Sequence, residues 1–169
     1  IIALLPGSRK QEITKMLSVM LSLVDDFSEY QFVIAGAPSQ DFSFYQSIIG
    51  SKNIAFIDNK TYDLLSVSFA ALVTSGTATL EAALFKVPQV VCYKGSNISY
   101  QIAKRIITLA YISLVNLIMD KEVVKELIQE DLTTKHLSIE LKKLLEDPTK
   151  QAAIKADYTA LKQVLTTGH

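Results

Sequence analysis

A short run of small residues, Ser75-Gly76-Thr77, is the first feature of this 169-residue chain that could do chemistry. An apolar run precedes it and a helix-forming run follows, so the pattern predicts a strand, a tight turn and a helix start. The first backbone N–H groups of a helix lack partners within the helix and carry the positive end of its dipole. The turn is therefore a candidate seat for an anion such as phosphate. On the turn alone, a helix cap that binds nothing stays open.

A second turn of the same kind, Gly7-Ser8-Arg9, follows the apolar residues 1–5. If the strand order is 3-2-1-4-5, the first and fourth strands are neighbours, and their turns face one another across one crevice. Arg9 can grip phosphate oxygens in a two-pronged fork, which a lysine cannot do. The two turns together predict a diphosphate cradle. The alternative for Arg9 is a solvated loop arginine.

Glu81 lies four residues after Thr77, on the same face of the predicted helix and one turn deeper. A carboxylate at that depth is too far in to bind a phosphate and would repel one. It could accept hydrogen bonds from the diol of a ribose, as acidic residues do in other nucleotide-binding folds. The alternative is a surface glutamate favoured by the helix dipole.

The elements that position these residues follow from the hydrophobic pattern. Strands are predicted at residues 1–5, 31–35, 53–57, 69–73 and 89–93. Helices are predicted at residues 11–27, 42–49, 61–67, 77–85, 97–109, 121–129, 134–146 and 148–165, with a mixed extended segment at 111–118. Strands that alternate with helices indicate an α/β fold, a Rossmann-like parallel sheet flanked by helices.

Composition excludes several classes of function. The chain has 17 basic and 17 acidic residues, so its net charge makes no case for nucleic-acid binding. A single cysteine, Cys92, cannot form an internal disulfide and reads as a buried strand residue, which suits a reducing cytoplasm. No spacing of Cys, His and carboxylates resembles a metal site. No apolar run is long enough to span a membrane, and no signal peptide is visible.

The length fits a single domain or one lobe of a larger protein. We expect one lobe over residues 1–169, with a helical tail from about residue 121 to the end. The chain opens at Ile1 directly inside an apolar strand, so we expect that an upstream segment is missing.

Four segments in order resemble the C-terminal half of lipid A disaccharide synthase, a bacterial glycosyltransferase family of the GT-B class. They are Leu-Leu-Pro-Gly-Ser-Arg at 4–9 with Glu12, Thr-Ser-Gly-Thr-Ala-Thr-Leu-Glu at 74–81, Tyr-Ile-Ser-Leu-Val-Asn-Leu at 111–117 and Val-Lys-Glu-Leu-Ile-Gln-Glu at 124–130. The likeness covers almost the whole chain. It implies a protein of two Rossmann-like lobes that face each other across a cleft, of which this chain is the donor-binding lobe.

The resemblance also implies a reaction. UDP-2,3-diacylglucosamine is the donor, lipid X (2,3-diacylglucosamine 1-phosphate) is the acceptor, and the products are lipid A disaccharide 1-phosphate and UDP. Transfer proceeds with inversion and without a cofactor or bound metal. The general base and the acceptor surface belong to the missing N-terminal lobe, so the isolated chain is expected to be inactive.

By the same resemblance, Arg9 and the Ser75–Thr77 turn hold the UDP diphosphate, Glu81 holds the ribose, and Asn116 and Gln129 line the donor site. The donor-site residues are thus Gly7, Ser8, Arg9, Ser75, Gly76, Thr77, Glu81, Asn116 and Gln129. One residue departs from the family pattern. The family usually has proline where this chain has Val115, so the loop before Asn116 is expected to be less rigid.

The resemblance implies a cytoplasmic protein, peripheral to the inner membrane, and leaves a homodimer open. Residues 97–109, with Lys104 and Arg105, could touch an anionic membrane, or could pack on the sheet with the basic side solvated. Two other functions stay open. One is another GT-B enzyme that uses UDP-N-acetylglucosamine, or the 2-epimerase, which would need acidic and histidine residues that are not found here. The other is a non-catalytic nucleotide-binding or scaffold domain whose turns are merely capped.

Overall fold

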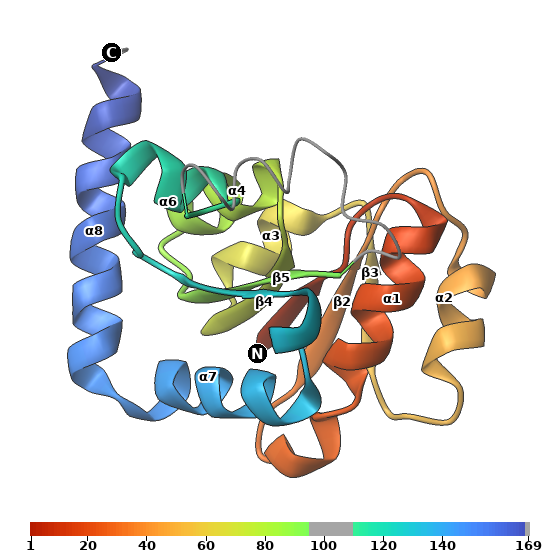
Figure 1. The fold of residues 1–169 in the computed structure, drawn as a ribbon. Helices are drawn as coiled ribbons and strands as arrows, with labels where there is room; N and C mark the ends of the chain where they lie inside the picture. Colours follow the sequence, from red (N-terminus) through yellow and green to blue (C-terminus); the bar gives the residue numbers. More distant parts are fainter. Residues whose placement is uncertain (95–109, 168–169) are drawn as a thin grey trace.

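A parallel sheet forms the centre of the chain in a computed structural model that describes residues 1–94 and 110–167 (Figure 1). Within these ranges the sheet has six strands in the order β3-β2-β1-β4-β5-β6, and every pair is parallel. The condition on which the shared crevice depended, the order 3-2-1-4-5, is met by the first five strands, and one strand is added. The strands are β1 (Ile2–Leu5), β2 (Phe32–Gly36), β3 (Ala55–Asp58), β4 (Ala70–Thr74), β5 (Gln89–Tyr93) and β6 (Lys125–Ile128).

The central strands are buried on both faces, which explains their continuous apolar sequences. Every residue of β1, β2 and β4 is buried, as expected of a parallel sheet covered by helices on both sides. In the register of the sheet, Leu5 lies beside Val73. The turns that follow β1 and β4 therefore begin at the same level of the same edge.

Helices cover both faces of the sheet. Ile2, Leu4 and Leu72 belong to a core cluster with residues of α1 (Lys10–Leu21), α2 (Phe42–Ile49) and α7 (Thr134–Glu146). Ala3, Leu5 and Val73 belong to a second cluster with residues of α3 (Thr61–Ser66) and α4 (Thr77–Leu84). Because successive strand residues point to opposite faces, these two clusters define the two helical layers.

A long helix, α8 (Pro148–Thr166), runs along the side of the fold, and its last turns project beyond α6 (Leu114–Met119) (Figure 1). A buried polar network fixes α8 to the sheet. Tyr158 donates its hydroxyl to the Val87 carbonyl at 2.9 Å, and Gln89 Nε2 donates to Tyr158 Oη at 3.1 Å and to the Thr79 carbonyl at 3.0 Å. The last of these bonds reaches the first turn of α4. Burial raises the pKa of Tyr158 above its ordinary value, so the hydroxyl keeps the proton that it donates.

Three predicted elements were wrong. The first helix does not continue to residue 27: α1 ends at Leu21, and a 3-10 turn, η1 (Val24–Phe27), follows. At this end the Ser22 N–H bonds to the Val19 carbonyl at 3.1 Å, the i→i−3 pattern that tightens the last turn of a helix.

The other two errors lie near the C-terminal part. Residues 114–119 form α6 instead of an extended segment, because Ser113 caps the helix by accepting a bond from the Asn116 N–H. Residues 125–128 form β6, followed by the 3-10 turn η2 (Gln129–Asp131), instead of a helix. β6 pairs with β5, a partner that local sequence does not reveal. The predicted helical tail therefore begins only with α7. The helix predicted at residues 97–109 lies outside the described residues.

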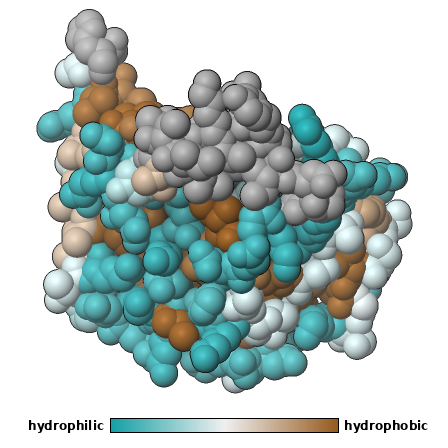
Figure 2. Space-filling model, in the orientation of Figure 1, coloured by the Kyte–Doolittle hydropathy of each residue, from teal (hydrophilic) through white to brown (hydrophobic). Residues whose placement is uncertain are grey.

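The surface view in Figure 2 shows a mainly hydrophilic face with small groups of apolar side chains between the polar ones. Within the described ranges, no helix combines the length and the apolar character needed to cross a bilayer.

Candidate functional site

A cleft of about 650 Å³ lies at the carboxyl edge of the sheet. Its walls are the turns after β1, β2 and β4, together with Thr61, Glu81 and Tyr93. Parallel sheets bind ligands at this edge, where the strand order reverses, and here the reversal falls between β1 and β4. The cleft brings together seven of the nine predicted site residues: Gly7, Ser8, Arg9, Ser75, Gly76, Thr77 and Glu81.

The β4–α4 turn has the predicted strand, turn and helix geometry. Gly76 is the N-cap of α4, has φ +127°, and no side chain caps the helix. That φ suits glycine, which has no Cβ to clash. Thr79 Oγ1 donates to the Gly76 carbonyl at 2.9 Å and so braces the first turn. The uncapped end of α4 thus faces the cleft with its N–H groups and the positive end of the helix dipole.

Thr74, the last residue of β4, was not singled out from the sequence. It lines the cleft, only 4% of it is exposed, and its hydroxyl has no hydrogen-bond partner among the described residues. A buried polar group without a partner costs about 1–3 kcal/mol, and native proteins carry few of them. The sequence signal was weak, because a threonine at the end of a strand is common.

The β1–α1 turn carries the one arginine of the cleft's described lining. Arg9 is exposed and is the N-cap of α1, with no side-chain cap bond. Gly7 has φ +107°, and a Cβ built there would overlap the carboxylate of Glu12. Glu12 Oε1 in turn accepts the Ser8 N–H at 3.0 Å. The turn is therefore shaped from inside by a glutamate that also lines the cleft.

The same turn is also held from outside. The Ser8 carbonyl accepts bonds from Ser39 Oγ at 3.0 Å and from Gln40 Nε2 at 3.2 Å. Both donors belong to the loop between β2 and α2. These bonds fix the position of the turn. The backbone of Arg9, the next residue, is therefore held at a defined position in the wall of the cleft.

Glu81 is half-buried and lines both the main cleft and an adjoining hollow of about 390 Å³. The hollow is otherwise lined by residues 59–63 at the start of α3. Tyr62 packs its ring against Phe85, with ring centroids 5.5 Å apart. Glu81 thus marks the α3–α4 side of the cleft, and Arg9 marks the α1 side.

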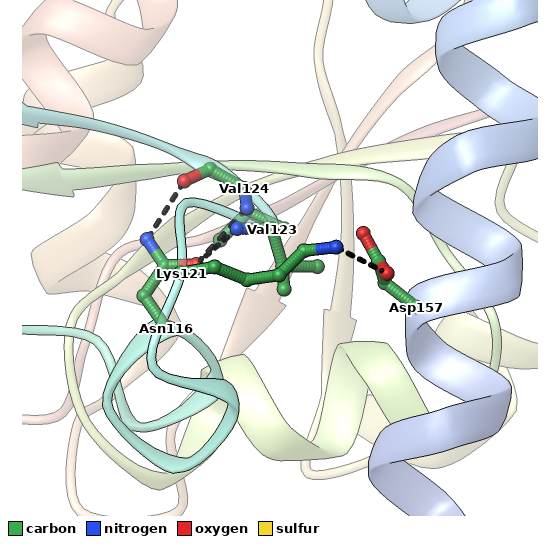
Figure 3. Close-up of polar contacts among 5 residues, drawn as sticks. All are labelled: Asn116, Lys121, Val123, Val124 and Asp157. Atoms are coloured by element: carbon green, nitrogen blue, oxygen red, sulfur yellow. Dashed lines mark hydrogen bonds and ion pairs between the residues drawn. The ribbon is translucent and has the colours of Figure 1, made fainter.

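Asn116 lies elsewhere, fully buried between α6 and the segment that leads to β6. Its Nδ2 donates to the Val124 carbonyl at 2.8 Å, and its Oδ1 accepts the N–H groups of Val123 at 2.8 Å and Val124 at 3.0 Å (Figure 3). Nearby, Lys121 pairs with Asp157 of α8 at 2.8 Å (Figure 3). Asn116 thus joins two segments of the fold.

A carboxylate completes this junction. Glu126 Oε2 accepts bonds from Asn116 Nδ2 at 3.1 Å and from the Ser113 N–H at 2.7 Å. Val115, where the related family usually has proline, is buried within α6, so the segment expected to be a loose loop is helical. Neither Asn116 nor Gln129 is among the residues that line the cleft. Their contact with a donor stays a prediction.

Other reactive groups offer little chemistry. Within the described ranges, no cluster of three or more His, Cys, Asp and Glu side chains is arranged to hold a metal ion. Cys92 is buried in β5, as predicted, and burial raises the pKa of its thiol to about 12. The thiol is therefore protonated near neutral pH and is a poor nucleophile.

Solved structures with similar folds are glycosyltransferases. One is spinosyn rhamnosyltransferase SpnG, solved with thymidine diphosphate. The superposition covers 94% of this chain and 41% of the SpnG chain, with a TM-score of 0.60 and 15% sequence identity. Another is WaaG, a glycosyltransferase involved in lipopolysaccharide biosynthesis. The superposition covers 94% of this chain and 41% of the WaaG chain, with a TM-score of 0.56 and 14% sequence identity. The chain thus has the fold of one lobe of a GT-B glycosyltransferase.

Sequence comparison identifies the family. A family model described as lipid-A-disaccharide synthetase matches residues 1–167. Lipid-A-disaccharide synthase of Syntrophus aciditrophicus is 36% identical over 97% of this chain and 45% of its own length, and that of Francisella philomiragia is 37% identical over 94% and 44%. The chain belongs to the lipid-A-disaccharide synthase family, as its motifs predicted. It spans about 45% of the length of these relatives.

Proposed function

We propose that this chain is the donor-binding lobe of a lipid-A-disaccharide synthase. It binds UDP-2,3-diacylglucosamine, and with its N-terminal lobe it transfers the sugar to lipid X, giving lipid A disaccharide 1-phosphate and UDP. One observation carries the proposal. In a chain of this family, the uncapped start of α4, Arg9 and Glu81 converge on one cleft at the switch point of the sheet.

The cleft's groups suit a nucleoside diphosphate. The N–H groups at the start of α4 and the Arg9 guanidinium bind the diphosphate, each bond to a charged group contributing about 1.5–3 kcal/mol. Glu81, one helical turn away, accepts bonds from the ribose hydroxyls. The same donors stabilise UDP as it departs with growing negative charge, and preorganised donors are most effective where charge develops.

Transfer needs a base to deprotonate the acceptor hydroxyl, and we assign that base and the lipid X surface to the N-terminal lobe. The isolated chain then binds donor without transferring sugar. Both substrates carry acyl chains, so we place the complete protein in the cytoplasm, peripheral to the inner membrane. No cofactor and no metal enter this scheme, because the helix start and Arg9 supply the positive potential.

Calorimetric titration of the chain with UDP tests the proposal. We expect millimolar or tighter binding, and Arg9→Ala should weaken it about tenfold, because the guanidinium bonds to charged oxygens. Lys155→Ala, which removes one exposed charge from α8, is the matched control and should bind as the wild type does. If the wild-type chain does not bind millimolar UDP, the proposal is wrong.

A further inference from the structure

The charge of the cleft is unusual for an anion site. Among its described lining residues, Arg9 is the one cation, and Glu12 and Glu81 are both carboxylates. In the proposed function, Glu81 binds the ribose and Arg9 binds the diphosphate, but Glu12 has no assigned role. A second carboxylate in a cleft that receives a polyanion needs an explanation.

Glu12, in the first turn of α1, reaches back to the turn that precedes the helix. Its Oε1 accepts the Ser8 N–H at 3.0 Å, and its carboxylate fills the space beside Gly7. The chain's own carboxylate therefore satisfies this amide, as a glutamate in the first turn of a helix often does, and the Ser8 N–H is not offered to a ligand. Among the described residues no group bonds to its second oxygen, Oε2, which remains able to accept a hydrogen bond.

The layers of the fold place Glu12 at a defined point along a bound donor. Glu81 belongs to the α3–α4 layer, and Arg9 and Glu12 belong to the start of α1 on the other face of the sheet. The Ser75-Gly76-Thr77 turn and the β1–α1 turn lie beside one another at the same edge of the sheet, because β4 pairs directly with β1, and both line the cleft together with Glu81. A donor with its ribose at Glu81 and its diphosphate at this turn has the β1–α1 turn, with Glu12, as the neighbouring wall of the cleft.

We propose that Glu12 is a specificity-determining residue that selects a neutral, hydroxyl-bearing sugar on the distal phosphate and rejects further negative charge there. The inference rests on the proposed function. A carboxylate accepts hydrogen bonds from sugar hydroxyls but cannot donate to an anion, and it repels a third phosphate or a sugar carboxylate through a partly desolvated cleft. Nucleoside triphosphates and acidic nucleotide sugars are the excluded classes.

Paired titrations of the complete chain with UDP and UTP, in EDTA and at low salt, test this role. Glu12→Gln keeps an oxygen for the Ser8 N–H and removes the charge. We expect the wild type to bind UTP about tenfold more weakly than UDP, and Glu12→Gln to reduce that ratio to near one. Glu29→Gln, at the amino edge of the sheet before β2, removes a charge outside the cleft and should leave the ratio unchanged.

The outcomes separate the two hypotheses. If UDP does not bind the wild type, the proposed function fails. If UDP binds but the ratio is the same in the wild type and in Glu12→Gln, or if the variant weakens both ligands equally, Glu12 only holds the turn and the inference is overturned.

A second measurement needs no variant. UDP-glucose and UDP-glucuronate differ at one sugar carbon, and the wild type should bind UDP-glucose about tenfold more tightly. Equal affinities would also overturn the inference.

Discussion

The most informative single residue is Thr74, because its buried hydroxyl has no partner among the described residues while it lines the cleft. Valine has nearly the same shape without the hydroxyl. We expect Thr74→Val to leave the free energy of unfolding unchanged or to raise it by up to about 1 kcal/mol, since a buried unpaired group is removed. UDP affinity should fall about fivefold if the hydroxyl bonds to the ligand. Denaturant unfolding and calorimetry measure the two effects.

Thr79 provides the matched control for that change. It is also a buried threonine, but its hydroxyl is bonded to the Gly76 carbonyl. Thr79→Val should therefore lower the free energy of unfolding by about 1 kcal/mol. A Thr74→Val variant that loses as much stability as Thr79→Val, with unchanged UDP affinity, would show that the Thr74 hydroxyl serves the fold and not the ligand.

Asn116 shows why sequence spacing alone does not decide a residue's role. A polar residue among apolar ones is equally consistent with a ligand contact and with a buried junction, and its partners Val123, Val124 and Glu126 lie outside its own helix. We expect Asn116→Ala to lower the free energy of unfolding by about 3 kcal/mol, because two backbone N–H groups, a backbone carbonyl and a carboxylate lose a partner.

Thermal and denaturant unfolding of Asn116→Ala measure that loss, with Asn53→Ala, at an exposed position, as the control. A variant that folds as stably as the wild type would show that the Asn116 bonds do not hold the two segments together.

At the scale of elements, the alternation of strands and helices was enough to predict five strands of a parallel sheet, while their order entered only as a condition that the structure meets. Long apolar strands such as β1 and β4 carry their own signal, because both faces are buried. β6 is different. It contains the charged residues Lys125 and Glu126, so its sequence pattern was interpreted as part of a helix. Its pairing with β5 is what makes it a strand. The meeting of two turns at one edge was predictable from strand order, while the Glu12 carboxylate inside one of them depends on side-chain geometry.

That geometry makes the β1–α1 turn a testable unit. Gly7→Ala should destabilise the chain by about 2–3 kcal/mol, from the strain of φ +107° and from displacement of Glu12, which breaks its bond to the Ser8 N–H. In a Glu12→Ala background the overlap is absent, so the same change should cost at least 1 kcal/mol less. A double-mutant cycle measured by denaturant unfolding reports this coupling.

Gly76→Ala is the comparison for this cycle, since a Cβ there meets no atom within 4 Å and only strain remains. Its cost should not depend on Glu12. If the costs of Gly7→Ala and Gly76→Ala respond to Glu12→Ala in the same way, the carboxylate does not fill the turn as described.

At the scale of the whole molecule, the question is whether this chain forms the proposed donor site by itself. The cleft is built within a single sheet edge, and α8 is fixed to the first turn of α4 through Tyr158 and Gln89. We therefore expect a preformed donor site in the isolated chain. A ligand at 100 times its Kd stabilises a folded protein by about 2.7 kcal/mol, which for a chain of this length raises the Tm by roughly 5–10 °C.

Differential scanning fluorimetry with saturating UDP measures this shift in Tm. Arg9→Ala at the same UDP concentration should show about half of the shift, because a tenfold weaker Kd removes about 1.4 kcal/mol of the stabilisation by the ligand. The same sample should release no UDP from a UDP-sugar in the presence of acceptor, since the base is assigned to the other lobe. Transfer by the isolated chain would place the base among its own residues, and a UDP shift equal in Arg9→Ala would move the diphosphate away from the β1–α1 turn.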